Sequence, residues 1–125
     1  MKHFADKTIE FRVGNRMIKI LVPEPAEVRK GYRQQKDADA ATPFPYWAKI
    51  WPAAMGLSQF LDANPGLVSN KTVLELAAGL ALPSLVAAVY AREVMASDYL
   101  FEAVEYMSAS VILNGFTNIK TLRIN

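Results

Sequence analysis

Apolar and polar residues alternate with period two near the start of the chain, and this pattern predicts two β-strands. The first run covers residues 8–13 and the second covers residues 16–22, with Gly14 and Asn15 positioned for a tight turn between them. This spacing is typical of a β-hairpin in which one face of each strand is apolar. Pro23 ends the second run, because proline lacks the backbone N–H that a strand ladder uses.

After the hairpin, residues 26–42 are polar without a clear period and indicate either a short helix or a mobile connection. Pro52 suits the first turn of a helix, which we expect to run to about Ala63. From residue 72 onward, short apolar runs alternate with segments of helical spacing, which favours a parallel sheet with right-handed crossovers. We expect strands at 72–76, 93–97 and 119–124 and helices at 83–90 and 100–114, the last with Phe101, Val104, Met107 and Val111 on one face.

The charge of the chain is unevenly distributed. The net charge is only +2, which argues for neither a nucleic acid nor a membrane as a partner. Residues 1–36, however, hold nine Lys or Arg against four Asp or Glu, and residues 37–125 hold five against eight. Two interpretations stay open: two solvated surfaces of opposite bias, or a basic arm that meets an acidic partner.

Several classes of site are excluded by residue content. There is no cysteine and only one histidine, His3, which excludes a Cys/His zinc site, a Cys nucleophile and an internal Ser-His-Asp triad. No metal site is expected. No apolar run approaches the roughly 18 residues of a membrane-spanning helix, and the start of the chain has no apolar signal core. We therefore expect a cytoplasmic protein.

The segment after the first parallel strand carries the most specific chemistry. Glu75 lies near the carboxyl end of that strand, and the small residues Ala77 to Ala81 lead into the next helix. Asp98 ends the second strand, and an acidic residue there can accept hydrogen bonds from a ribose diol. Only Gly79 remains of a GxGxG pattern, so the loop does not favour a pyrophosphate. An ordinary strand–helix turn with small residues for packing stays an alternative.

Four strings in the same order resemble the motifs of class I, or seven-β-strand, S-adenosylmethionine (SAM)-dependent methyltransferases. They are most similar to the branch that includes many protein-lysine methyltransferases. The strings are YWAKIWPAAMGLSQFL at 46–61, VLELAAGLALPSLVAA at 73–88, VMASDYLFEAVE at 94–105 and LNGFTNI at 113–119.

The resemblance implies an α/β fold: a Rossmann-like parallel sheet, strands 1 to 3 of the methyltransferase fold, preceded by the hairpin and a helix. Residues 1–42 would form the hairpin and connecting segment, and residues 43–125 the N-terminal part of a truncated SAM-binding domain. A complete fold of this kind also has strands 4 to 7 and their loops. We therefore expect the catalytic residues to lie beyond residue 125 and this chain alone to be inactive. An open strand edge at Val73, Leu74 and Leu76 would then favour a homodimer or a strand-swapped assembly.

The resemblance also implies roles for particular residues. The backbone of Ala77 and Gly79 would approach the methionine part of SAM, and Glu75 would hold its amino group. Asp98 would bind the ribose hydroxyls, and Trp51 would form a wall of the cofactor pocket and donate its N–H. Simpler roles stay open: Trp51 as a core aromatic, Glu75 as a cap of the adjacent turn, and Asp98 as the N-cap of the following helix.

The sequence thus predicts a SAM-dependent methyltransferase that acts on a protein side chain, lysine being the favoured acceptor. A small-molecule N- or O-methyltransferase and a non-catalytic Rossmann-like assembly module are the alternatives. A nicotinamide-dependent dehydrogenase is disfavoured, because its loop needs glycines where this chain has Ala77 and Ala81.

Overall fold

The computed structural model describes residues 6–125, so His3 lies outside the described residues. Its first feature is the expected hairpin: strands β1 (Asp6–Val13) and β2 (Arg16–Pro23) pair antiparallel, with Val13 opposite Arg16 at the turn. Gly14 has φ +58°, a left-handed conformation that glycine adopts without strain.

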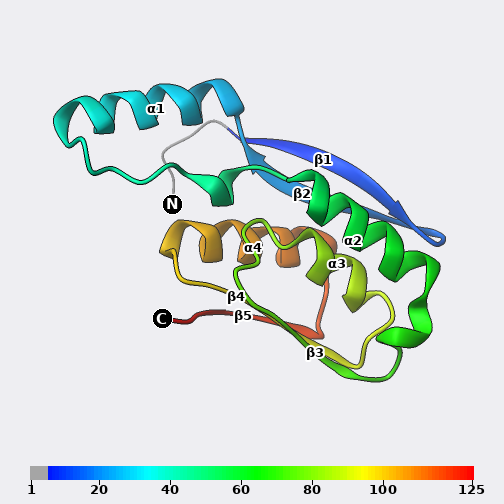
Figure 1. Ribbon diagram of the computed structural model, residues 1–125. Coiled ribbons are helices and arrows are strands. Elements are labelled where there is room, and N and C mark those ends of the chain that lie inside the picture. Colours follow the sequence, from blue (N-terminus) through cyan, green and yellow to red (C-terminus); the bar gives the residue numbers. More distant parts are fainter. Residues whose placement is uncertain (1–5) are drawn as a thin grey trace.

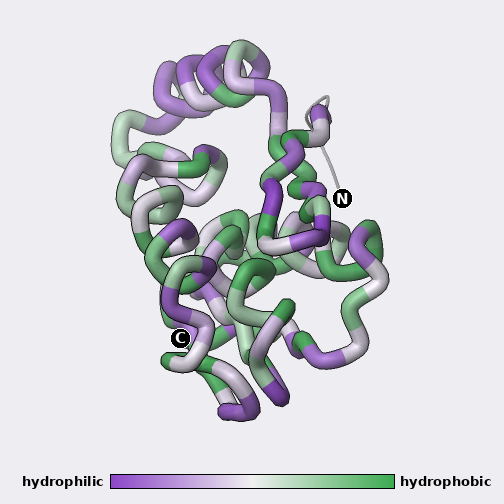
Figure 2. The backbone as a smooth tube through the Cα atoms, turned by 90° about the vertical axis from the view of Figure 1, so that its right-hand side faces the viewer, coloured by the Kyte–Doolittle hydropathy of each residue, from purple (hydrophilic) through white to green (hydrophobic). Residues whose placement is uncertain are grey.

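Helix α1 (Pro25–Ala38) follows the hairpin directly. Glu24 caps its start by accepting a hydrogen bond from the backbone N–H of Ala26. The segment that the sequence left open between a helix and a mobile connection is therefore a regular helix. Only Val28 is buried in it, which explains the missing apolar period. Figure 2 shows α1 as a mostly hydrophilic coil at the top of the view.

The rest of the chain forms the alternating α/β unit. A short 3₁₀ turn, η1 (Tyr46–Ala48), precedes the first helix of the unit, and a second, η2 (Pro65–Leu67), follows that helix. The strands pair in parallel in the order β3-β4-β5, as predicted. The elements in chain order are α2 (Pro52–Ala63), β3 (Thr72–Glu75), α3 (Leu82–Ala88), β4 (Glu93–Asp98), α4 (Phe101–Asn114) and β5 (Ile119–Arg123).

Helices α3 and α4 lie between the hairpin and the three-stranded sheet (Figure 1). One buried cluster joins the apolar face of the hairpin to the helices, with Ile18 and Ile20 packed near Leu85 and Tyr106. A second cluster beneath α4 joins Ala96 of β4 to Met107. The core therefore continues across residue 42, and the division into two domains there stays a prediction.

Helix α4 packs against the hairpin on one side and the sheet on the other. The prediction of a single apolar face for this helix is therefore wrong in part. Phe101 is 57% exposed, whereas the small Ala103 and Ser110 are fully buried. Ser110 Oγ accepts a hydrogen bond from the backbone N–H of Leu21, and the Asn114 side chain bonds both the N–H and the carbonyl of Lys19. Polar side chains of α4 thus satisfy the free edge of β2, a role that an apolar period cannot reveal.

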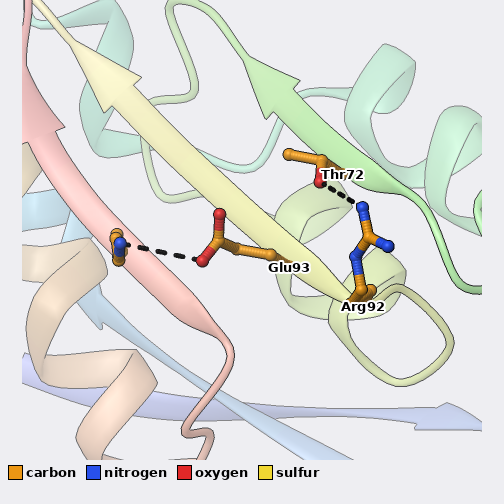
Figure 3. A network of polar contacts seen from close by, with 4 residues as sticks. Thr72, Arg92 and Glu93 are labelled. Carbon is orange, nitrogen blue, oxygen red and sulfur yellow. Dashed lines mark hydrogen bonds and ion pairs between the residues drawn. The ribbon is translucent and has the colours of Figure 1, made fainter.

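The face of the sheet away from α3 and α4 is open among the described residues. Leu74 is 50% exposed and Leu76, just beyond the end of β3, is 64% exposed. On this face Lys120 Nζ lies 3.7 Å from Glu93 Oε2, and near it Arg92 donates to Thr72 Oγ1 (Figure 3). Within residues 6–125, β3 pairs with β4 alone.

None of the helices in the described part of the chain is both long and apolar enough to cross a membrane. The cytoplasmic location stays a prediction.

Candidate functional site

A cavity of about 460 Å³ opens at the carboxyl ends of β3 and β4. This is the edge at which ligands bind in open α/β sheets, and the volume lies within the usual range for small-molecule sites. Three segments form its walls: the loop before α2, the first turns of α2, and the turn between β3 and α3. Its lining includes Phe44, Tyr46, Trp47, Lys49, Ile50, Trp51, Leu57, Glu75, Ala77, Gly79, Ala81, Asp98 and Leu100.

The turn between β3 and α3 has left-handed backbone at three alternate positions. Ala77, Gly79 and Ala81 have φ of +53°, +59° and +66°. These are the three positions of the GxGxG pattern, so the pattern reflects the conformation of the backbone. Alanine in this region is strained by roughly 1 kcal/mol or more, because its Cβ approaches the following carbonyl oxygen. The loop therefore keeps the shape of a glycine loop at an energetic cost.

Gly79 is also held close to the loop that precedes α2. A Cβ added there would lie 3.4 Å from the carbonyl oxygen of Trp47 and 3.7 Å from its Cα. This contact, together with the positive φ, explains why the glycine is kept at the middle position.

Asp98 joins the turn between β3 and α3 to the turn between β4 and α4. Its Oδ2 accepts a hydrogen bond of 2.9 Å from the N–H of Gly79, and its Oδ1 accepts one of 3.0 Å from the N–H of Leu100. The N-cap residue of α4 is Leu100, so Asp98 is not itself the N-cap. Each carboxylate oxygen has two lone pairs, so each can accept a second hydrogen bond from the cavity side.

Glu75 joins the end of β3 to the first turn of α3. Its Oε1 accepts hydrogen bonds from the backbone N–H of Ser84, at 3.1 Å, and from the Ser84 hydroxyl, at 2.6 Å. The simpler role considered for Glu75, a cap of the adjacent turn, is therefore present. The pKa of the Glu75 carboxyl is raised above its ordinary value of 4.5, chiefly because the carboxyl is buried. The hydrogen bonds from Ser84 lower the pKa in part, and the nearby charge of Asp98 raises it slightly further.

Trp51 forms one wall of the cavity and is 38% exposed, which is too open for a core aromatic. Its indole N–H donates to the carbonyl oxygen of Tyr46 at 2.7 Å, so in this structure the N–H is used within the chain. The Tyr46 ring lies 5.9 Å from the Trp51 ring, and Lys49 Nζ lies 4.5 Å from the Trp51 ring centroid. The loop before α2 is thus stiffened by its own aromatic contacts.

All five residues predicted from the sequence line this one cavity: Trp51, Glu75, Ala77, Gly79 and Asp98. The sequence reasoning missed Ser84 and Lys49. Ser84 occupies the third position of α3, where a side chain commonly meets the orphan N–H groups of the first turn, so its position was a usable signal. Lys49 had no signal, because only the fold of the loop brings it over Trp51.

The sequence is similar to curated protein-lysine methyltransferases. It is 42% identical over 69 residues to protein-lysine N-methyltransferase EFM3 of Chaetomium thermophilum, covering 54% of this chain and 20% of that protein. It is 42% identical over 77 residues to protein N-terminal and lysine N-methyltransferase EFM7 of Eremothecium gossypii, covering 57% and 29%. It is 33% identical over 82 residues to the electron transfer flavoprotein beta subunit lysine methyltransferase of Mus musculus, covering 65% and 32%. The aligned part thus spans between a fifth and a third of the length of these relatives. No protein-family model matches the chain.

Solved structures agree on the fold. A SAM-dependent methyltransferase from Agrobacterium tumefaciens superposes with a TM-score of 0.60 at 16% identity, over 97% of this chain and 33% of that one. Trm5b from Pyrococcus abyssi superposes with a TM-score of 0.50 at 14% identity, over 96% and 36%. The resemblance inferred from the four motifs is therefore confirmed: in sequence the aligned part is similar to protein-lysine methyltransferases, and in fold the chain is similar to a portion of a SAM-dependent methyltransferase.

Proposed function

We propose that this chain binds SAM in the cavity at the ends of β3 and β4 and forms the cofactor-binding part of a protein methyltransferase. The observation that carries the proposal is the pairing of two carboxylates, Glu75 and Asp98, with an aromatic wall at Trp51 in one cavity of about 460 Å³. SAM carries a sulfonium and an ammonium group, so an acidic and aromatic cavity suits its positive charges.

The donors and acceptors of the cavity fit this cofactor. The two oxygens of Asp98 already bond Gly79 and Leu100 and keep free lone pairs, which suits a ribose diol. Only Oε1 of Glu75 accepts hydrogen bonds from described residues, so Oε2 is left for the amino group. The small side chains of Ala77 and Gly79 would let the backbone approach the methionine part.

The cofactor supplies an activated methyl group on a sulfonium, which leaves as a neutral thioether. The residues of this chain would bind and orient it and exclude water from one side of the site. Displacement at such a carbon needs neither a metal nor a protein nucleophile. We assign no catalytic residue among those described.

A protein lysine is the acceptor that the sequence comparisons favour, since the three relatives above are named for lysine methylation. A lysine amine attacks only when it has lost its proton, and its ordinary pKa is about 10.4. The acceptor site must therefore lower that pKa or remove the proton.

A separate part of the proposal concerns self-association at the open edge of β3. Because β3 pairs with β4 alone among the described residues and Leu74 on it is half exposed, we propose that a second copy pairs along the other edge of β3, as expected from the sequence. Sedimentation at increasing protein concentration should show a dimer. A monomer at the highest concentration would contradict this part and leave cofactor binding untouched.

Calorimetric titration of SAM into the chain tests the main proposal. Asp98→Ala should weaken binding at least about 100-fold, since it removes a charged acceptor and leaves two N–H groups unpaired. Asp98→Asn, which keeps one acceptor oxygen, should bind with intermediate affinity. Asp37→Ala, a carboxylate removed from the exposed end of α1, should bind SAM like the unaltered chain. Equal SAM affinity for Asp98→Ala and the unaltered chain would refute the assignment.

A further inference from the structure

A second cavity, of about 390 Å³, lies on the other side of the loop that precedes α2. We call it the basic cleft. The hairpin, α1 and that loop form its walls. Among its lining residues are Lys7, Ile9, Val22, Val28, Arg29 and Lys49.

The charged side chains of the basic cleft have one sign. Lys7, Arg29 and Lys49 line it, and no Asp or Glu is among its described lining residues. No ion pair joins Lys7 or Arg29 to another described residue, and both side chains are exposed. The ammonium of Lys49 lies over the Trp51 ring at the wall. Three cations around one cleft, none of them in an ion pair with a described residue, attract an anionic occupant.

The floor of the basic cleft is apolar. Val22 and Val28 are buried at its base, while Ile9 and Phe44 are 37% and 46% exposed. The apolar face of β1 therefore ends here, at Ile9, without being covered by described residues. A ligand that only neutralised charge, such as a phosphate, would leave this surface exposed, whereas an apolar side chain would bury it.

The basic cleft and the cofactor cavity share a wall. Phe44, Lys49, Ile50 and Trp51 line both. A chain segment held in the basic cleft would therefore lie one loop away from the cofactor, and a residue that follows the segment could reach the cofactor cavity around that loop.

We propose that the basic cleft binds a segment of the acceptor protein that combines acidic residues with an apolar side chain. The inference rests on the proposed function, since it assigns the docking site of the methyl acceptor. The charge complementarity of Lys7, Arg29 and Lys49 selects the acidic residues, and the floor at Val22 and Val28 selects the apolar one.

The probe is a fluorescein-labelled hexapeptide, Asp-Leu-Glu-Asp-Leu-Glu, measured by fluorescence anisotropy against its neutral analogue, Asn-Leu-Gln-Asn-Leu-Gln. The acidic peptide should bind more tightly, and its advantage should shrink as salt screens the charges. Arg29→Glu and Lys7→Glu should each weaken binding about tenfold. Lys30→Glu is the matched control, because it makes the same charge change at the next position of α1, outside the basic cleft, and should change affinity less than about twofold.

The outcomes separate this inference from cofactor binding. Arg29 does not line the cofactor cavity, so Arg29→Glu should titrate with SAM like the unaltered chain. If the SAM titration fails while the acidic peptide binds in an Arg29-dependent way, the proposed function is wrong and the basic cleft is still an acidic-peptide site. If SAM binds but the peptide affinity is the same for Arg29→Glu and Lys30→Glu, the docking inference is overturned. Tighter binding of a labelled RNA hexamer than of the acidic peptide would overturn it as well.

Discussion

The two cavities on either side of the loop before α2 differ in charge although they share part of their walls. The cavity proposed to bind the cofactor is lined by the carboxylates Glu75 and Asp98, while the basic cleft is lined by Lys7 and Arg29. Lys49 borders both. The charge bias of the sequence has a partial structural counterpart here. Lys7 and Arg29 of the basic cleft come from the basic first third of the chain, and Glu75 and Asp98 come from the acidic remainder.

The difference in charge between the two cavities determines which ligand each one favours. A cationic cofactor is attracted to the acidic cavity and repelled from the basic cleft, and an acidic peptide has the opposite preference. The shared loop, stiffened by contacts of Trp51 with Tyr46 and Lys49, keeps the two environments apart. Changes in the shared loop should therefore affect both cavities, and changes elsewhere should affect only one.

Among changes in the shared loop, Trp51→Ala should have the largest effect on both cavities together. Loss of the ring opens the wall between the cavities, so affinity for SAM and for the acidic peptide should both fall about tenfold. Calorimetry and anisotropy measure the two affinities on the same sample. Phe60→Ala removes an aromatic side chain that is also exposed on α2 but lines neither cavity, and it should leave both affinities unchanged. A loss confined to one ligand would show that Trp51 is not a common wall.

Glu75→Gln should have two smaller effects in opposite directions, one on folding stability and one on the affinity for SAM. The pKa of Glu75 is raised in the folded chain, chiefly by burial, so the folded state holds the proton more tightly than the unfolded state. Folding stability from this group therefore falls as pH rises from its ordinary pKa of 4.5 toward the raised value. At pH 7 Glu75→Gln should be at least as stable as the unaltered chain, and that gain should vanish below pH 4.5. Its affinity for SAM should nevertheless fall several-fold, because the carboxylate is lost.

Urea unfolding at pH 7 and pH 4 measures the stability change for Glu75→Gln. Glu93→Gln is the control, because Glu93 forms an exposed ion pair with Lys120 on the open face of the sheet and should change stability little at either pH. If Glu75→Gln destabilises the chain at pH 7, the hydrogen bonds from Ser84 to the ionised carboxylate outweigh its burial.

The smallest expected effect is on the free energy of unfolding, at two alanines with similar backbone strain. Ala77 is exposed and Ala81 is buried, and both have positive φ. Ala77→Gly should raise the free energy of unfolding by up to about 1 kcal/mol, since it relieves strain without losing contacts. Ala81→Gly should be near neutral, because the loss of one buried methyl group, worth about 0.8 kcal/mol, offsets the relief. Equal stability changes for Ala77→Gly and Ala81→Gly would contradict the finding that Ala77 is exposed and Ala81 is buried.

Several parts of the structure were predictable from local pattern. The hairpin follows from period-two alternation around Gly14, and the parallel sheet follows from apolar runs separated by helical spacing. Four of the five predicted site residues, Glu75, Ala77, Gly79 and Asp98, line one cavity because the carboxyl ends of parallel strands meet at one edge, whereas Trp51 reaches the cavity from the loop before α2. These features depend on the chain near each residue and on general rules of connection.

Other parts depend on packing between distant segments. The face of α4 was partly mispredicted, because Ser110 and Asn114 bond the edge of β2, about 90 residues earlier in the chain. The hydrogen bond from Gly79 to Asp98 and the donation of the Trp51 N–H to Tyr46 arise only once the loops are folded. The basic cleft was visible in the sequence only as a charge bias, since its walls come from three separate segments.

A ¹H–¹⁵N correlation spectrum of the chain titrated with SAM tests most directly whether SAM binds at the carboxyl ends of β3 and β4. The largest shifts are expected at the backbone N–H of Gly79, Leu100 and Ser84, which bond the two carboxylates, and at the indole N–H of Trp51. The N–H of Lys19, bonded to Asn114 on the far side of α4, should not move. Shifts concentrated at Lys7, Arg29 and the hairpin, or no shifts at all, would contradict the assignment of the acidic cavity to the cofactor.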